Sequence, residues 1–196
     1  QMLSNPIENL DAILYTHEHN DHTAGLDDIR PFFFRQGDIP VFAHKRVLDS
    51  LRKRFEYIFT STNKYPGAPG VIEHEIVNKP FYFNDLKITP IDYKHNRLQV
   101  FGFRLKDFAY LTDLKSIEEE EVQKLDGVKV LVVTALRIEP HHSHLNLEEA
   151  LESIERVKPE RAYLTHISHL LGFHDEVQEQ LPKNVFVAYD NLEITI

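Results

Sequence analysis

Residues 16–22, with the sequence THEHNDH, place three histidines and two acidic side chains directly after an apolar run. His17 and His19 are two residues apart, so on an extended or looping segment both imidazoles point the same way and can bind one ion. Asp21 and His22 are neighbours and can serve a second ion close by. Imidazole and carboxylate ligands without thiolate suit zinc, manganese or iron. Because the cluster ends a predicted buried strand, it favours a metal site over a solvated turn.

A similar pattern recurs further along the chain. The apolar runs AILYT, FAYLT and RAYLT each close with threonine, and His17, Asp113 and His166 follow them. A fourth run, ITPIDY, leads into Lys94 and His95 in the same way. Reactive groups in layered α/β folds gather at the carboxyl ends of strands. We therefore expect these four strand ends to converge on one centre.

The elements that must position these residues alternate between strands and helices, which predicts a mixed α/β architecture in a single domain over residues 1–196. Strands are expected at 11–16, 39–44, 72–77, 86–93, 98–105, 108–112, 128–134 and 161–165, with one or two more in 185–196. Helices are expected at 45–59, 116–125 with Ser116 as cap, 146–157 opened by Asn146, and 174–181. Residues 25–34 are expected to form a short helix or turn cut by Pro31, and the breaker-rich residues 60–70 a loop.

Composition narrows the class of protein. The chain has 196 residues, with 22 basic against 31 acidic side chains and a formal net charge of −9. Such a chain repels nucleic acid unless a local basic patch overrides the field, and no basic run is longer than RKR. There is no cysteine, which excludes disulfides and thiolate metal sites. No apolar run approaches a membrane span and no signal-peptide pattern opens the chain, so a cytoplasmic enzyme without a membrane partner is expected.

The segment THEHNDHTAGL resembles the signature of the metallo-β-lactamase-fold hydrolases. The segments PIDYKHNRLQVFGFRL, FAYLTD, PHHSHLNLEEAL and YLTHISH fall in the order and spacing of one branch of that family. This branch holds the phosphoribosyl cyclic phosphate phosphodiesterase and, more distantly, RNase Z. The resemblance covers nearly the whole chain and implies an αββα sandwich with its active site along one sheet edge. Family members usually begin with several strands before the signature, so the N-terminal strands are expected to be missing from this chain.

The resemblance also implies a dinuclear site with two divalent metal ions, zinc or manganese, as cofactors. One ion would be held by His17, His19 and His95. The other would be held by Asp21, His22 and His166, and Asp113 would bridge the two. His144 matches the catalytic histidine of the family, which lies just before the NLEEAL segment.

The function implied is a metal-dependent phosphodiesterase that cleaves a small phosphodiester, linear or cyclic, with a hydroxide held by the two metals. His144 would protonate the leaving oxygen or hold the phosphorane oxygens. Three alternatives stay open: an RNase Z-like RNA 3′-end endonuclease, a lactone, thioester or β-lactam hydrolase, and a non-catalytic binding module. A homodimer is a further expectation, since relatives are often dimers.

The remaining candidates are weighed as follows. His142 is the rival of His144 for the acid role, and His169 is the rival of His166 as a ligand. Arg30 and Arg137 are candidates for phosphate contact, and the loop around Tyr65 for a lid. The other histidines are expected to have no chemical role, either in a loop (His141) or at the surface or strand ends (His44, His74 and His174).

Overall fold

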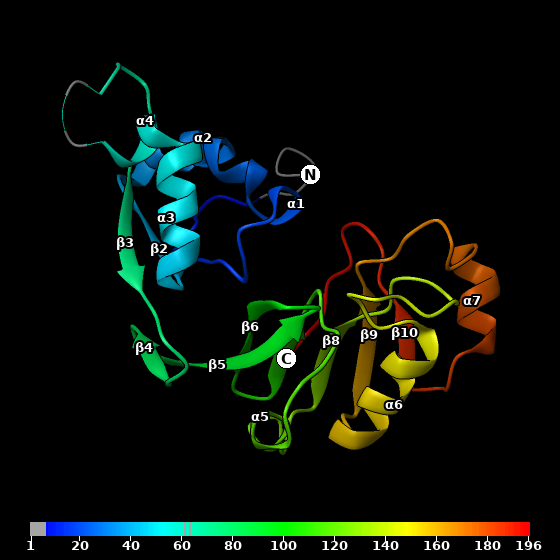
Figure 1. The fold of residues 1–196 in the computed structure, drawn as a ribbon. Helices are drawn as coiled ribbons and strands as arrows, with labels where there is room; N and C mark the ends of the chain where they lie inside the picture. Colours follow the sequence, from blue (N-terminus) through cyan, green and yellow to red (C-terminus); the bar gives the residue numbers. More distant parts are fainter. Residues whose placement is uncertain (1–6, 61, 63) are drawn as a thin grey trace. The chain divides into compact units, whose positions relative to one another are not determined.

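The computed structural model describes residues 7–60, 62 and 64–196. The chain divides into two compact units, residues 1–77 and residues 78–196, which we call unit 1 and unit 2 (Figure 1). The division into two units does not test the expectation of a single domain over residues 1–196, which stays a prediction. No helix within the described residues is long and apolar enough to cross a membrane.

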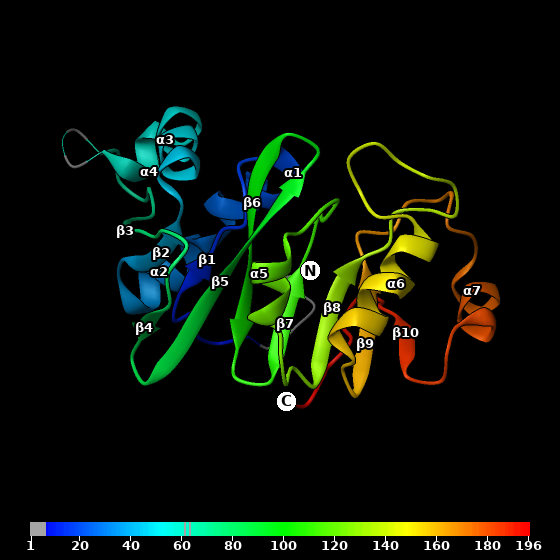
Figure 2. The ribbon, with the colours of Figure 1, turned by 60° about the horizontal axis from the view of Figure 1, so that its bottom comes forward.

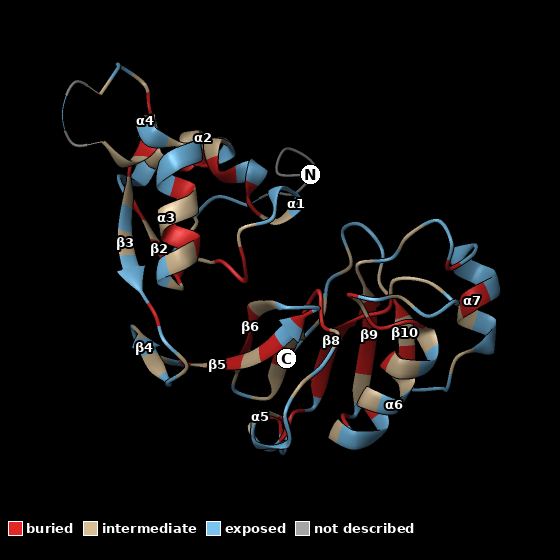
Figure 3. Cartoon of the chain, viewed as in Figure 1, coloured by how far each residue is buried: buried red, intermediate tan, exposed pale blue. Residues whose placement is uncertain are grey.

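Unit 1 is built on a three-stranded parallel sheet in the order β1-β2-β3. Its strands are β1 (Ile13–Leu14), β2 (Ile39–Ala43) and β3 (Val71–Glu75). Its helices are α1 (Asn20–Thr23), the 3₁₀ helix η2 (Ala24–Ile29), α2 (Arg30–Gln36), α3 (Lys45–Arg54) and α4 (Glu56–Phe59). The central strand β2 is almost wholly buried, as Figure 3 shows, because it has a neighbour on each side and helix α3 packs in the same core. From α3, Val47, Leu48 and Leu51 enter that core at helical spacing.

Two expectations for unit 1 are wrong in detail. The helix expected at 45–59 is two helices, because the backbone of Phe55 leaves the helical region (φ −121°, ψ 40°) between α3 and α4. Pro31 does not cut a helix but lies in the first turn of α2, where its missing N–H has no intrahelical partner to lose. Of the expected loop 60–70, residues 61 and 63 lie outside the described residues.

Unit 2 holds a seven-stranded mixed sheet in the order β10-β9-β8-β7-β6-β5-β4 (Figure 2). The strands are β4 (Phe81–Phe83), β5 (Leu86–His95), β6 (Leu98–Leu105), β7 (Phe108–Leu111), β8 (Val130–Thr134), β9 (Arg161–Thr165) and β10 (Val185–Val187). Strands β4 to β7 pair antiparallel, and β7 to β10 pair parallel. The helices are α5 (Glu119–Gln123), α6 (Leu147–Val157) and α7 (His174–Gln180). The carboxyl ends of β7, β8 and β9 therefore lie side by side.

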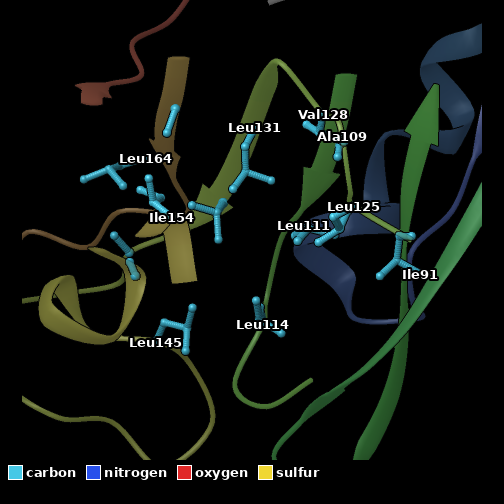
Figure 4. Close-up of a cluster of buried hydrophobic side chains, with 14 of the residues drawn as sticks. Ile91, Ala109, Leu111, Leu114, Leu125, Val128, Leu131, Leu145, Ile154 and Leu164 are labelled. Carbon is cyan, nitrogen blue, oxygen red and sulfur yellow. The ribbon is translucent and has the colours of Figure 1, made fainter. Parts of the chain in front are cut away.

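Alternation along the strands gives this sheet two apolar faces. Leu131 of β8 points to the face on which Ile154 of α6 packs (Figure 4), and Val133, two residues further along the strand, belongs to the same core cluster. Val130 and Val132 point to the other face, where partly buried apolar residues of the C-terminal segment 188–194 cover them. Burial on both faces explains why β8 reads as a continuous apolar run rather than an alternating one.

The main differences in unit 2 lie at element ends. Ser116 is not a helix cap: its carbonyl accepts the backbone N–H of Lys94 (2.9 Å), and α5 begins three residues later at Glu119. The segment 185–196 forms one strand, β10, in agreement with the one or two expected, whereas β4 was not expected from the sequence. By contrast, Asn146 caps α6 as expected, in a capping box with Glu149.

Candidate metal centre

Asp113 is the centre of the ligand group in unit 2. It directly follows Thr112 at the end of β7, is 1% exposed, and adopts a left-handed backbone conformation with φ 57°. Its backbone N–H donates to the hydroxyl of Thr134 (2.6 Å), the last residue of the neighbouring strand β8. The Thr112 hydroxyl donates to the Asp113 carboxylate (3.0 Å). Two threonines that close adjacent strands thus fix both the backbone and the carboxylate of this residue.

Three imidazoles from different parts of unit 2 face this carboxylate. His166, after β9, places Nε2 3.1 Å from Oδ1 of Asp113. His144, in the loop before α6, places Nε2 3.4 Å from Oδ2, and His95, at the end of β5, places Nε2 3.9 Å from the same oxygen. Ligand atoms of Asp113, His144 and His166 all lie within 4.8 Å of one another. A buried carboxylate among imidazoles is a donor set that a divalent cation fits.

Hydrogen bonds on the far side of these groups orient them. Nδ1 of His95 lies 2.8 Å from the carbonyl oxygen of Ser143, so Nδ1 carries the proton and Nε2 is left as the donor atom for a metal. The buried hydroxyl of Tyr93 donates to the carbonyl of Thr112, next to Asp113. Burial raises the pKa of Tyr93 well above its ordinary value, and the Asp113 carboxylate raises it further, so Tyr93 stays a hydrogen-bond donor.

The second group of candidate ligands lies in unit 1, between β1 and η2. His17 is fully buried, and its ring centroid lies 4.6 Å from that of His19 and 4.3 Å from that of His22. The Thr16 hydroxyl lies 3.0 Å from Nδ1 of His17. Nε2 of His22 lies 3.1 Å from Oδ2 of Asp21. Residues 17–22, which end in the short helix α1, therefore carry four of the expected ligands.

Glu18, between two of these histidines, is held by helix α3. Its carboxylate pairs with Nε of Arg46 (3.1 Å), and its backbone carbonyl accepts a hydrogen bond from Arg54 (2.8 Å). Both arginines belong to α3, and the Glu18 side chain is 21% exposed. The arginines fix the backbone that presents His17 and His19.

The rival histidines lie elsewhere. His142 and His169 are exposed, whereas His144 and His166 face Asp113. His141 lies in a loop as expected, but its Nδ1 is 3.1 Å from Nδ1 of His144, a contact that the sequence did not indicate.

The remaining histidines have structural partners. His44 caps α3 by accepting the backbone N–H of Arg46 (3.2 Å). His74 stacks on Phe42, with ring centroids 4.4 Å apart. His174, at the start of α7, pairs with its neighbour Asp175 (2.9 Å), which raises the His174 pKa.

The two arginines singled out from the sequence both hold loops. Arg30 pairs with Asp27 (2.6 Å) and donates to the carbonyl of Gly67 (2.9 Å) and the hydroxyl of Tyr65 (3.4 Å). Arg137 donates to backbone carbonyls in its own loop, those of Glu139 and Pro140. The guanidinium groups of both arginines thus donate hydrogen bonds to backbone carbonyls of loops.

Sequence reasoning missed residues that support the ligands rather than bind. Thr134 closes the run VKVLVVT just as threonine closes AILYT, FAYLT and RAYLT, so the repeated final threonine was a signal for it. Tyr93 and His141 had no such signal, because each acts on a residue that only the fold or the loop conformation brings near.

Comparison with known proteins places the chain in a family. Residues 2–167 match the model of the β-lactamase superfamily domain. The chain belongs to this superfamily. Its mixed α/β structure with two sheets is that of the metallo-β-lactamase fold, which confirms the expected fold class and family. As in the wider superfamily, the fold is one that generally holds divalent metal ions, and the His and Asp groups described above provide suitable ligands.

Among solved structures of the superfamily, the chain is similar to a new diphosphatase from the PhnP family. The two share 33% identity and a TM-score of 0.90, over 99% of this chain and 74% of that one. Human tRNase Z, short form, shares the fold at 17% identity and a TM-score of 0.69, over 100% of this chain and 83% of that one.

One curated relative is named as a transferase and not as a hydrolase. The chain is 38% identical over 198 residues to a protein of Porphyromonas gingivalis (strain ATCC BAA-308 / W83) named octanoyltransferase. The match takes in 100% of this chain but only 40% of that protein, so the chain spans less than half the length of this relative.

Proposed function

We propose that this superfamily member is a dinuclear metal-dependent phosphodiesterase that cleaves a small phosphodiester, linear or cyclic. The observation that carries the proposal is the Asp113 carboxylate, buried and faced by the imidazoles of His95, His144 and His166 at 3.1–3.9 Å. The similarity of the chain to a diphosphatase of the PhnP family, at 33% identity, supports cleavage of a bond to phosphorus over hydrolysis of an acyl bond.

In this proposal the two groups of ligands act on one pair of divalent ions. His17, His19 and His95 would hold the first ion, Asp21, His22 and His166 would hold the second, and Asp113 would contribute its carboxylate to both. When bound, such a pair supplies an activated water and neutralises charge on the phosphoryl oxygens. The donor set of nitrogen and oxygen atoms suits zinc or manganese.

The residues of the chain have separate tasks. Thr134 holds the backbone N–H of Asp113, and the Thr112 hydroxyl donates to its carboxylate and so orients the two oxygens. His95 is held by the Ser143 carbonyl. His144 transfers a proton from Nε2 to the leaving oxygen as the P–O bond breaks, because that nitrogen faces the centre while Nδ1 is engaged by Ser143 and His141.

A second candidate reaction is cleavage of a diphosphate bond, which the similarity to a diphosphatase favours. The same residues would serve, since both reactions displace an oxygen from phosphorus. An RNA substrate is less suited to a chain with net charge −9. The name octanoyltransferase belongs to a much longer protein, and acyl chemistry is therefore tested rather than assumed.

The test is a substrate panel on the purified protein with its metal content measured. We expect hydrolysis of bis-p-nitrophenyl phosphate, or of a dinucleoside diphosphate, and loss of activity on chelation. A thioester and nitrocefin should be hydrolysed far more slowly. Faster hydrolysis of either would overturn the proposed bond type, and a metal-free protein indifferent to chelators would favour a non-catalytic binding module.

His144→Ala separates ligand from catalyst. We expect this variant to keep its metals and to lose most turnover, by about 10²-fold or more. Loss of metal from the variant would move His144 into the ligand set and contradict the role proposed for it.

A further inference from the structure

The loop between β8 and α6 carries three histidines, and two of them touch. Nδ1 of His141 lies 3.1 Å from Nδ1 of His144, and the Ser143 hydroxyl lies within 3.2 Å of both atoms. His142 lies between them in sequence but is exposed, and its ring is tilted against that of His141, with ring centroids 4.3 Å apart. The direct neighbour of the proposed acid is therefore His141.

The positions of the hydrogens follow from these contacts. Two ring nitrogens at hydrogen-bond distance attract each other only if one carries a proton and the other a lone pair. The backbone N–H of Ser143 donates to Nδ1 of His141 (3.4 Å), which makes that nitrogen an acceptor. Nδ1 of His144 must then be the donor. The remaining nitrogen of His144, Nε2, is the one at 3.4 Å from Asp113.

The environment of His141 suits an acceptor. Burial is the largest influence that lowers the pKa of His141. This direction favours the neutral ring, in agreement with the hydrogen bonds that make Nδ1 of His141 an acceptor.

We propose that His141 is a positioning residue that holds a proton on Nδ1 of His144 and so reserves Nε2 of His144 for exchange with the substrate. The inference rests on the proposed function, in which His144 is the acid. When the P–O bond breaks, the proton on Nε2 goes to the leaving oxygen. His144 is left neutral with its Nδ1 proton still directed at His141, so His141 itself neither gains nor loses a proton.

Two variants of His141 test this role against one matched control. His141→Leu removes the acceptor, whereas His141→Asn offers an amide oxygen near the position of Nδ1. His142→Ala is the control, because it removes an exposed histidine from the same loop and keeps both partners of the His141–His144 contact.

The activity readout compares two leaving groups on the same nucleoside 5′-phosphodiester, p-nitrophenol and methanol. A p-nitrophenolate leaves without a proton, whereas methoxide needs one. We expect His141→Leu to lower kcat on the methyl ester by at least tenfold and on the p-nitrophenyl ester by less than threefold. His141→Asn should recover most of the loss, and His142→Ala should change neither rate.

The second readout needs no turnover. Nitrogen-15 chemical shifts of the His144 ring report which nitrogen carries the proton. When the His144 ring is neutral, the wild-type protein and His141→Asn should show the Nδ1–H form, and His141→Leu a mixture with the Nε2–H form.

Contrary results separate the two proposals. If His144→Ala slows the methyl ester selectively but His141→Leu behaves like His142→Ala, the role of His141 is wrong and that of His144 stands. Equal loss on both esters in His141→Leu, with lost metal or an unchanged tautomer, would make His141 merely structural. If His144→Ala shows no leaving-group dependence, the acid assignment itself fails.

Discussion

The backbone N–H of Asp113 donates a hydrogen bond to the side chain of Thr134, across the ends of two neighbouring parallel strands. The bond continues the β7–β8 pairing beyond its last backbone pair, Leu111 and Val133, at a residue that has already turned into the left-handed region. It replaces a backbone partner that the turn removes, and so satisfies a buried amide.

Removing the Thr134 hydroxyl should destabilise this turn. Thr134→Val keeps the shape but leaves the Asp113 N–H unsatisfied in a buried site, so we expect the free energy of unfolding to fall by about 2 kcal/mol. Thr134→Ser keeps the hydroxyl and should lose less than half as much. Urea unfolding in the presence of a chelator measures the effect without metal. A smaller loss in Thr134→Val than in Thr134→Ser would show that the methyl group, not the hydrogen bond, matters here.

Removing the charge of Asp113 should empty part of the proposed metal site. In Asp113→Asn one oxygen becomes an amide nitrogen, which has no lone pair for a cation, so we expect loss of at least one of two ions. Elemental analysis of the purified variant gives the stoichiometry. Asp126→Asn, at an exposed position, is the control and should keep full occupancy. Two fully occupied ions in Asp113→Asn would argue against a bridging carboxylate.

Glu121 should make the stability of unit 2 depend on pH. Burial alone would raise the pKa of this carboxyl, but hydrogen bonds from Lys124, Asn78 and the Asp92 backbone at 2.7–2.8 Å outweigh it and hold the pKa below its ordinary value. A carboxyl with a lowered folded-state pKa stabilises the fold above the unfolded pKa of about 4.3, and the contribution is lost as pH falls through the folded value.

We therefore expect Glu121→Gln to be less stable than the wild-type protein by about 2 kcal/mol at pH 7, with the difference shrinking below about pH 4. Urea unfolding at pH 7, 5, 4 and 3 measures it. The exposed neighbour Glu120, changed to Gln, is the matched control and should have little effect at any of these pH values. A difference that stays constant with pH would exclude the ionised carboxylate as its source.

Gly102, in the middle of β6, should not tolerate a side chain. A Cβ there would lie 2.7 Å from the Tyr110 carbonyl oxygen and 2.8 Å from the Tyr93 ring, and the carbonyl belongs to the paired backbone of β7. We expect Gly102→Ala to lower the free energy of unfolding by about 1–3 kcal/mol. In Gly25→Ala the new Cβ would meet only an Asp28 oxygen at 3.8 Å, so thermal unfolding of that control should match wild type. Equal melting temperatures for the two variants would show that the sheet adjusts.

The sequence predicted strand positions well where apolar alternation is bounded by turn residues. The strands expected at residues 98–105 and 161–165 are confirmed to the residue. Prediction was wrong where a tertiary contact competes with a local signal. Ser116 precedes a run of acids and looks like a helix cap, but its carbonyl pairs with Lys94, which is distant in sequence. The local pattern contained no sign of that pairing.

The candidate site shows the same division. Motif spacing picked out His95, Asp113 and His166, because strand ends carry a readable pattern, and the structure of unit 2 brings them together. His141 and Tyr93 could not be predicted, since their roles depend on which atom each reaches. His141 lies in a loop as expected, and the conformation of that loop brings its ring against His144.

Strands β7 and β9 flank β8, so Asp113 and His166 follow strands that are separated by one other strand. Both residues have a positive φ. Neighbouring strands are spaced by about 4.8 Å, so their backbones are held roughly 10 Å apart by the sheet itself. This distance is set by the pairing of the backbones and does not depend on which side chains occupy the two positions. Another coordinating side chain could therefore replace the carboxylate or the imidazole at these two positions, and the distance between their backbones would stay the same.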